Sequence, residues 1–222
     1  MNYTWDFSSI ITYRHILYEG LGGTLLLSIV SVLTAMGIGL LMCLMRTSSS
    51  RIARAPATIF VNFFRNIPFI VQLFWLFYAL PILTGMQAKP FLAAYIALSL
   101  YGGAYFTEIF RAGLQGVEKG QWEAAKAIGL GYASTLNQVI VPQAVRRVLP
   151  PLTTQVIELI KLTTVASSIS YAELLYAGKL VADQEFRPLE AYTTVAIILI
   201  LLLCLVAMAG AWLENRLKIE AR

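Results

Sequence analysis

Residues 191–213 read AYTTVAIILILLLCLVAMAGAWL, a stretch without a single charged side chain. A helix needs about 20 apolar residues to cross a bilayer core of roughly 30 Å, so this stretch is long enough to span a membrane. Residues 21–45, which read LGGTLLLSIVSVLTAMGIGLLMCLM, meet the same condition. These two uncharged segments predict an all-α membrane protein.

Three further apolar segments lie between these two, and each is interrupted by a few polar or charged residues. Five predicted spans place the two ends of the chain on opposite sides of the membrane. No polar stretch is long enough for an attached soluble domain, so we expect a single transmembrane domain over residues 1–222. The inner spans are expected at about 57–83, 91–117 and 148–171.

The composition also favours lipid as the environment of the chain. Its 222 residues are 58% apolar and 13% charged, whereas soluble domains carry about 25% charged residues. The net charge of +5 does not indicate nucleic-acid binding, because the basic residues flank the apolar spans. No metal site is expected, since the chain has one histidine and two cysteines that lie far apart in apolar runs.

The distribution of Lys and Arg over the connections predicts the orientation. Cytoplasmic connections of membrane proteins carry an excess of basic residues. The connections after the first, third and fifth spans hold most of the basic residues here. We therefore predict the N-terminus outside and the C-terminus in the cytoplasm. The cytoplasmic set is Arg46, Arg51, Arg54, Lys119, Lys126, Arg146, Arg147, Arg216, Lys218 and Arg222, and the outer set is Arg14, Lys89, Lys179 and Arg187.

The first twenty residues mix aromatic and aliphatic side chains with polar ones. Such a composition fits a segment that lies in the membrane interface, or else a packed N-terminal turn. Tryptophan concentrates at the membrane–water interface, so Trp5 and Trp212 are expected to act as interface anchors.

The connection at residues 118–147 reads EKGQWEAAKAIGLGYASTLNQVIVPQAVRR. Residues 121–128 favour helix, and Gly129 supplies a flexible position that ends it. This helix is too short and too polar to cross a membrane, so we expect an exposed knob on the cytoplasmic surface. A second helical stretch, 133–140, is predicted to stop at Pro142.

This connection resembles the cytoplasmic loop of the permeases in binding-protein-dependent ABC importers. The family pattern is Glu-Ala-Ala, three residues, Gly, nine residues, Ile-x-Leu-Pro. The spacing here matches throughout, with Val139 and Val141 in place of Ile and Leu. In that family the helix docks into a groove on the ATPase and transmits its motion, so the resemblance implies a coupling role. The residues assigned to coupling are Gln121, Glu123, Ala124, Ala125, Ala127, Gly129 and Pro142.

Three further segments resemble the polar amino acid branch of this family. Residues 62–73, NFFRNIPFIVQL, look like its second-span signature. Residues 105–113 look like the end of its third span, and residues 142–174 look like its fourth span. The departures from the common pattern are Thr154 for Asn, Gln155 for Glu and Leu162 for Asp.

The resemblance implies a multi-pass subunit of a bacterial cytoplasmic membrane. The chain has no G-x-x-x-x-G-K-[ST] pattern for nucleotide phosphates. We therefore expect no enzymatic activity and no cofactor in this chain, with ATP and Mg²⁺ bound by a dimer of separate ATP-binding subunits. Five spans enclose too little space for a pathway, so a second permease, identical or paralogous, is also expected. The remaining expected partners are an extracytoplasmic solute-binding protein, the amino acid itself and membrane lipid.

Charged side chains inside the predicted spans are candidates for a substrate path, because a charge at the bilayer centre costs roughly 2.5–3.5 kcal/mol on insertion scales. Glu108 and Arg111 share a helix face, and so do Glu158 and Lys161. Both pairs suit a zwitterionic amino acid, but the first pair could equally form a gate or a tie between helices. Arg65 either reaches the cytoplasmic headgroups or pairs with a glutamate of another span. The predicted path residues are Lys161, Glu158, Gln155, Glu108, Arg111 and Arg65.

Gln155 bears on the choice of substrate. An amide in place of a carboxylate favours an acidic or neutral amino acid, such as glutamate, aspartate or glutamine, although Glu158 lies one turn away and argues against this. The resemblance thus implies ATP-driven import of a polar amino acid by alternating access. The alternative is an ion-coupled secondary transporter, which intramembrane glutamates would serve. The odd number of spans and the lack of visible inverted repeats argue against it.

Overall fold

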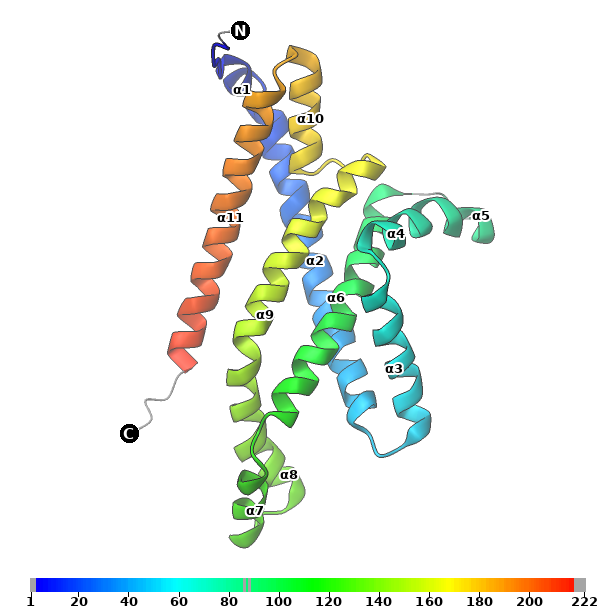
Figure 1. Cartoon of the computed structure of the whole chain (residues 1–222), viewed down its shortest axis with the longest axis vertical. Coiled ribbons are helices and arrows are strands. Elements are labelled where there is room, and N and C mark those ends of the chain that lie inside the picture. Colours follow the sequence, from blue (N-terminus) through cyan, green and yellow to red (C-terminus); the bar gives the residue numbers. More distant parts are fainter. Residues whose placement is uncertain (1–2, 86, 88, 218–222) are drawn as a thin grey trace. The chain divides into compact units, whose positions relative to one another are not determined.

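The computed structural model describes residues 3–85, 87 and 89–217 (Figure 1). Almost all of this part of the chain is helical and none of it is β-strand, so the predicted all-α class is confirmed. Two of the basic residues used to predict the orientation, Lys218 and Arg222, lie outside the described residues. The α-helices are α1 (Ser8–Thr12), α2 (Arg14–Thr47), α3 (Arg51–Asn66), α4 (Phe69–Phe74), α5 (Leu80–Thr84), α6 (Pro90–Gln115), α7 (Lys119–Ala127), α8 (Tyr132–Thr135), α9 (Val141–Thr163), α10 (Leu174–Glu185) and α11 (Pro188–Leu217).

Two of the described helices, α2 and α11, are long and apolar enough to cross a membrane. A third candidate exists if the bent pair Arg51–Asn66 and Phe69–Thr84 counts as one broken span. α6 and α9 contain 26 and 23 residues, which at about 1.5 Å per residue is enough to cover a hydrocarbon core of roughly 30 Å. The predicted five spans, their orientation and the single domain stay predictions.

Pro68 interrupts the second predicted span. α3 ends at Asn66 and α4 begins at Phe69, because Pro68 has an extended ψ of 136°. A residue that precedes proline is disfavoured in the helical region, which explains why the helix stops here. The amide Nε2 of Gln72 donates to the carbonyl oxygen of Ile67 at 2.9 Å and satisfies one backbone group that the break exposes.

The predicted stop at Pro142 is wrong. Leu136–Ile140 forms a π-helical turn, and α9 continues directly from Val141 through Pro142 to Thr163. Proline lacks an amide N–H, so it cannot make the ordinary α-helical hydrogen bond to the fourth preceding carbonyl. A wider turn directly before the proline accommodates that missing bond. The same arrangement occurs at Trp75–Ala79, a π-helical turn that precedes Pro81.

The chain divides into two compact units, and four of the long helices contribute to both. Unit 1 consists of Met1–Leu33, Ile67–Ser99 and Ile157–Leu205. In it α10 packs against the first turns of α2 and α11 (Figure 1), with Leu17, Leu174, Ala177 and Val195 in the core. A Cβ atom on Gly23 would lie 2.2 Å from the backbone oxygen of Ala172, so only glycine allows this close approach.

Unit 2 consists of Thr34–Asn66, Leu100–Val156 and Val206–Arg222. Its largest fully buried side chain is that of Phe106 on α6. A Cβ atom on Gly39 would lie 2.6 Å from the Cβ of Phe106, and one on Gly113 would lie 2.1 Å from a methyl group of Val148. Glycines therefore bring α6 close to both α2 and α9, as is common where helices pack in membranes.

Candidate functional site

α7 is the helix that the sequence predicts as an exposed knob, and it begins at Lys119. Gly129 follows its end with a φ of +81°, in the left-handed region that glycine adopts without strain. The amide N of Leu130 donates to the carbonyl oxygen of Ala125 at 3.0 Å, and the amide N of Gly129 donates to that of Lys126 at 3.0 Å. These bonds satisfy the last carbonyls of the helix, so the prediction that Gly129 ends it is confirmed.

One face of α7 is exposed, and the other packs on neighbouring residues of unit 2. Trp122 packs against the buried cluster of Val117, Ile140 and Ala144. Ala125, one of the predicted coupling residues, is only 3% exposed and so supports the helix from beneath. The exposed face, called the α7 surface below, consists of Glu123, Ala124, Ala127 and Ile128.

Two side-chain contacts join α7 to the helices that follow it. The rings of Trp122 and Tyr132 stack with their centroids 5.8 Å apart. The amide Nε2 of Gln143 donates to Oε1 of Gln121 at 3.1 Å, which connects α7 to the first turn of α9, beside the exposed Pro142. An open pocket of about 360 Å³ lies next to the α7 surface. It is lined by Trp122, Glu123, Lys126, Leu130, Tyr132 and Thr135.

A carboxylate held by two arginines connects α2 to α6 in unit 2. Glu108 pairs with Arg46 of α2 and with Arg111, whose Nη2 lies 2.6 Å from Oε2 of Glu108. The side chains of Glu108 and Arg46 are each 19% exposed, so most of this charge is shielded from solvent. The Arg46–Glu108 ion pair joins α2 to α6 and is therefore a tie between helices, which is one of the roles predicted for Glu108. The sequence did not indicate Arg46, because it lies 62 positions from its partner.

Arg65 contacts an aromatic ring of unit 2. Its guanidinium carbon lies 5.0 Å from the centroid of the Tyr105 ring. This distance allows a cation–π interaction, which at an exposed side chain such as that of Arg65 contributes about 0.5–1 kcal/mol.

Glu158 and Lys161 form an ion pair along α9 in unit 1. The side chains are 43% and 51% exposed, so both charges remain accessible from outside the helix. Gln155, the remaining predicted path residue, belongs to unit 2. Its amide Nε2 is buried and has no hydrogen-bond partner among the described residues.

Glu173 is a buried carboxylate that the sequence analysis missed. It precedes α10, and its two oxygens accept hydrogen bonds from the amide N of Leu175 at 2.9 Å and of Tyr176 at 2.8 Å. Burial raises the pKa of Glu173 to about 7, although the two backbone hydrogen bonds act in the opposite direction. An acidic residue directly before an apolar helical run was the available signal, since helix N-termini attract negative charge.

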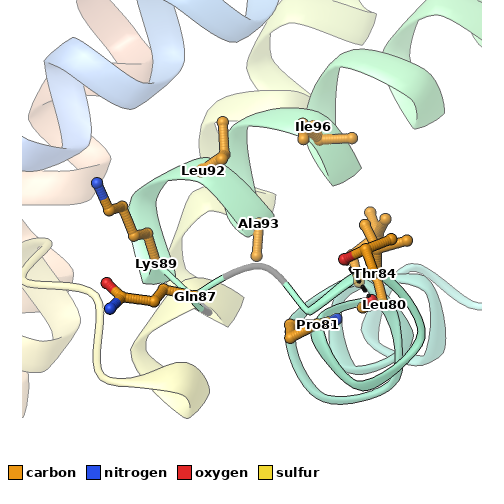
Figure 2. A pocket seen from close by; sticks show the side chains of 9 residues that line it. Leu80, Pro81, Thr84, Gln87, Lys89, Leu92, Ala93 and Ile96 are labelled. Atoms are coloured by element: carbon orange, nitrogen blue, oxygen red, sulfur yellow. Dashed lines mark hydrogen bonds between the residues drawn. The ribbon is translucent and has the colours of Figure 1, made fainter.

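A small apolar pocket lies between α5 and the start of α6 in unit 1 (Figure 2). Its volume of about 50 Å³ holds a few water molecules but no amino acid. Figure 2 shows the Lys89 side chain at its edge, directed away from Leu80 and Thr84. The pocket contains none of the predicted path residues. Residues 3–85, 87 and 89–217 contain no group of three His, Cys, Asp or Glu side chains that could hold a metal ion.

Comparison with known proteins identifies the family of the chain. A family model described as binding-protein-dependent transport system inner membrane component matches residues 24–219. The chain belongs to this family. The matched region of the permease includes α7, the α7 surface and the whole of α9, whereas the N-terminal residues before position 24 lie outside it.

Two curated relatives match the permease over nearly its full length. The glutamine transport system permease protein GlnP of Escherichia coli (strain K12) is 35% identical over 216 residues, which cover 97% of the permease and 99% of GlnP. The arginine transport system permease protein ArtQ of Bacillus subtilis (strain 168) is 30% identical over 213 residues, which cover 96% of the permease and 97% of ArtQ.

Solved structures agree with this assignment. A chain from the crystal structure of an amino acid ABC transporter with histidines superposes with a TM-score of 0.90 at 31% identity, covering 96% of the permease and 100% of that chain. An inward-facing structure of the MetNI methionine ABC transporter superposes with a TM-score of 0.75 at 21% identity, covering 93% of the permease and 98% of that chain. At that lower identity the second match shows the fold alone.

Proposed function

We propose that this permease is the membrane-spanning subunit of an ATP-driven importer that moves a polar amino acid into the cytoplasm by alternating access. The α7 surface carries the proposal. It presents Glu123 and two exposed alanines on a short helix that is anchored from beneath by Trp122 and Ala125. Small side chains allow another protein to approach closely, and a rigid base transmits force instead of absorbing it.

The proposed arrangement has five spans in one transmembrane domain, with the N-terminus outside and the C-terminus in the cytoplasm. α7 then faces the cytoplasm, where two ATP-binding subunits would bind ATP and Mg²⁺ and contact the α7 surface. A second permease, identical or paralogous, completes the pathway, and a solute-binding protein delivers the amino acid from outside. The names of the relatives support an amino acid as the cargo.

Motion at α7 has a direct mechanical route into the membrane helices. The hydrogen bond between Gln121 and Gln143 joins α7 to α9, and the Trp122–Tyr132 stack joins α7 to α8. The chain is helical without a break from Tyr132 to Thr163. A displacement of α7 by the ATPase therefore moves the same continuous helix that carries Glu158 and Lys161, which is the kind of change that alternating access requires.

Glu158 and Lys161 are the proposed substrate-path residues on this helix, because an accessible pair of opposite charges suits the ammonium and carboxylate of an amino acid. Gln155, with its unpartnered amide donor, favours an acidic or neutral side chain on the substrate. Glu108, Arg111 and Arg65 are assigned to the inner end of the path.

The test of this proposal is affinity purification of the permease in mild detergent, followed by mass spectrometry. We expect an ATP-binding subunit to co-purify, and a second, paralogous permease in the same sample would decide for a heterodimer. The complex in liposomes, with the solute-binding protein on the opposite side from the ATPase, should take up radiolabelled glutamine or glutamate only when ATP is present on the ATPase side. Uptake by the isolated chain under a proton or sodium gradient would instead establish the secondary-transporter alternative.

A further inference from the structure

The N-terminal segment, residues 3–7, is attached to the first turn of α11 through one buried carboxylate, Glu190. The hydroxyl of Tyr3 donates to Oε2 of Glu190, and the amide N of Asp6 donates to Oε1 at 3.1 Å. Arg187 approaches the same carboxylate, with Nη1 3.0 Å from Oε1, and also donates to the carbonyl oxygen of Thr4 at 3.3 Å. Glu190 is 0% exposed, so these partners enclose it completely.

This attachment presents three aromatic side chains on the surface of unit 1. The rings of Trp5 and Phe7 stack 5.7 Å apart with 3° between their planes, and the ring of Tyr3 meets that of Trp5 edge-on at 5.7 Å. The three residues are 50%, 56% and 41% exposed, in the order Tyr3, Trp5 and Phe7. Phe186, in the turn that leads to α11, is 88% exposed. An exposed apolar cluster of this kind is typical of a surface that contacts a membrane, a ligand or another protein.

The position of Glu190 fixes the level of this cluster relative to the membrane. From Ala191 onward the residues of α11 are uncharged and mostly apolar up to Leu213. Only 6% of the most apolar 18-residue stretch of this helix is buried inside the protein. A charged pair such as Arg187 and Glu190 avoids the hydrocarbon core because of the cost of inserting charge. The pair therefore marks the boundary of the core. Tyr3 is hydrogen-bonded to Glu190, and the rings of Trp5 and Phe7 follow it through ring contacts, so the cluster is expected at the level of the interfacial zone. Tryptophan and tyrosine are enriched in this zone.

We propose that residues 3–7 form a lipid-interface anchor, in which Tyr3, Trp5 and Phe7 embed among the headgroups and Glu190 sets their depth. The occupant of this surface is phospholipid, because the segment that carries the cluster is hydrogen-bonded to the first turn of α11, a membrane-span candidate whose apolar length is almost entirely exposed. The anchor would hold the start of α11 at a fixed depth while other helices move.

The experiment uses the full chain with Trp5 as its only tryptophan, made by changing Trp75, Trp122 and Trp212 to Phe. The protein is placed in phospholipid vesicles that carry a spin label either at the headgroup or in the middle of the acyl chain. We expect the headgroup label to quench Trp5 fluorescence more strongly than the mid-chain label. Strong quenching by aqueous iodide with none by either lipid label would overturn the proposal. Trp5 would then lie in water, where the cluster could contact only a soluble partner. Stronger quenching by the mid-chain label would contradict the proposed depth.

The role of Glu190 is tested by Tyr3→Phe, which keeps the ring but removes the hydroxyl that donates to Glu190. We expect a loss of headgroup-label quenching, because one of the bonds that fix the segment is gone. The matched control is Tyr18→Phe, which removes the hydroxyl of another exposed tyrosine and should leave Trp5 unchanged. Unaltered quenching in Tyr3→Phe would show that the hydrogen bond from Tyr3 to Glu190 does not set the depth.

Discussion

Glu173 offers a measurable pH dependence, because it is a fully buried carboxylate whose pKa burial raises from 4.5 to about 7. The substitution Glu173→Gln keeps the shape and one acceptor oxygen for the amides of Leu175 and Tyr176 but cannot ionise. Comparison of the two proteins over pH isolates the effect of the buried charge from all other titrations.

The sign of the effect follows from which state loses its proton first. Below about pH 4.5 the carboxyl is protonated in both the folded and the unfolded chain. Between about 4.5 and 7 the unfolded chain ionises while the folded chain holds its proton, so the free energy of unfolding falls as pH rises. Above about 7 both states are ionised and the loss is complete. The interval from 4.5 to about 7 corresponds to about 3 kcal/mol.

We therefore expect Glu173→Gln to gain stability relative to the unchanged protein by up to about 3 kcal/mol between about pH 5 and pH 8. The assay is the apparent Tm in detergent, read as the loss of monodisperse protein on size exclusion after heating. Asp183→Asn, which neutralises an exposed acid on the same helix α10, is the control and should show no such trend. Parallel Tm curves for Glu173→Gln and the unchanged protein would show that the charge of Glu173 does not change the free energy of unfolding.

Three further substitutions test the packing, the helix tie and the α7 turn. Gly23→Ala forces a Cβ against a backbone oxygen 2.2 Å away and should cost about 1–3 kcal/mol in thermal stability, whereas Gly22→Ala, with nothing within 4 Å, should cost far less. Equal Tm values for these two would contradict the close packing. Glu108→Gln leaves two arginines without their carboxylate and should lower stability by about 1–3 kcal/mol; an unchanged Tm would argue against the tie. Gly129→Ala places a side chain at a φ of +81° and should cost about 1–2 kcal/mol and reduce ATP-driven uptake, whereas Gly131→Ala at a φ of −68° should do neither. The same uptake in both would exclude a role for the left-handed turn.

Local signals in the sequence predicted the helical class, the short helix α7 and its end at Gly129. Each of these depends on neighbours within a few positions, such as an apolar run or a glycine after a helical stretch. The break at Pro68 follows the same local rule. At Pro142 that rule fails, because a π-helical turn supplies the room that the proline needs and the helix continues. A sequence pattern records the proline but not the wider turn before it.

Contacts between distant residues were beyond the reach of the sequence. Arg46 pairs with Glu108 across 62 positions, and Tyr3 reaches Glu190 across 187. Charge counting had placed Arg46 only among the flanking cations, since a residue's partner on another helix depends on how the helices pack. The pairing of Glu158 with Lys161 was predictable because it lies within a single helical turn.

The proposed function requires that a partner ATPase binds the α7 surface and moves α7. The most direct test measures ATP-driven amino acid uptake and ATP hydrolysis in liposomes for Glu123→Lys, with Asp183→Lys as a control that reverses an exposed charge on α10. We expect Glu123→Lys to insert normally but to lose both uptake and association with the ATP-binding subunit, while the control retains both. Full uptake and normal co-purification of the ATPase with Glu123→Lys would exclude the α7 surface as the docking site of the ATPase.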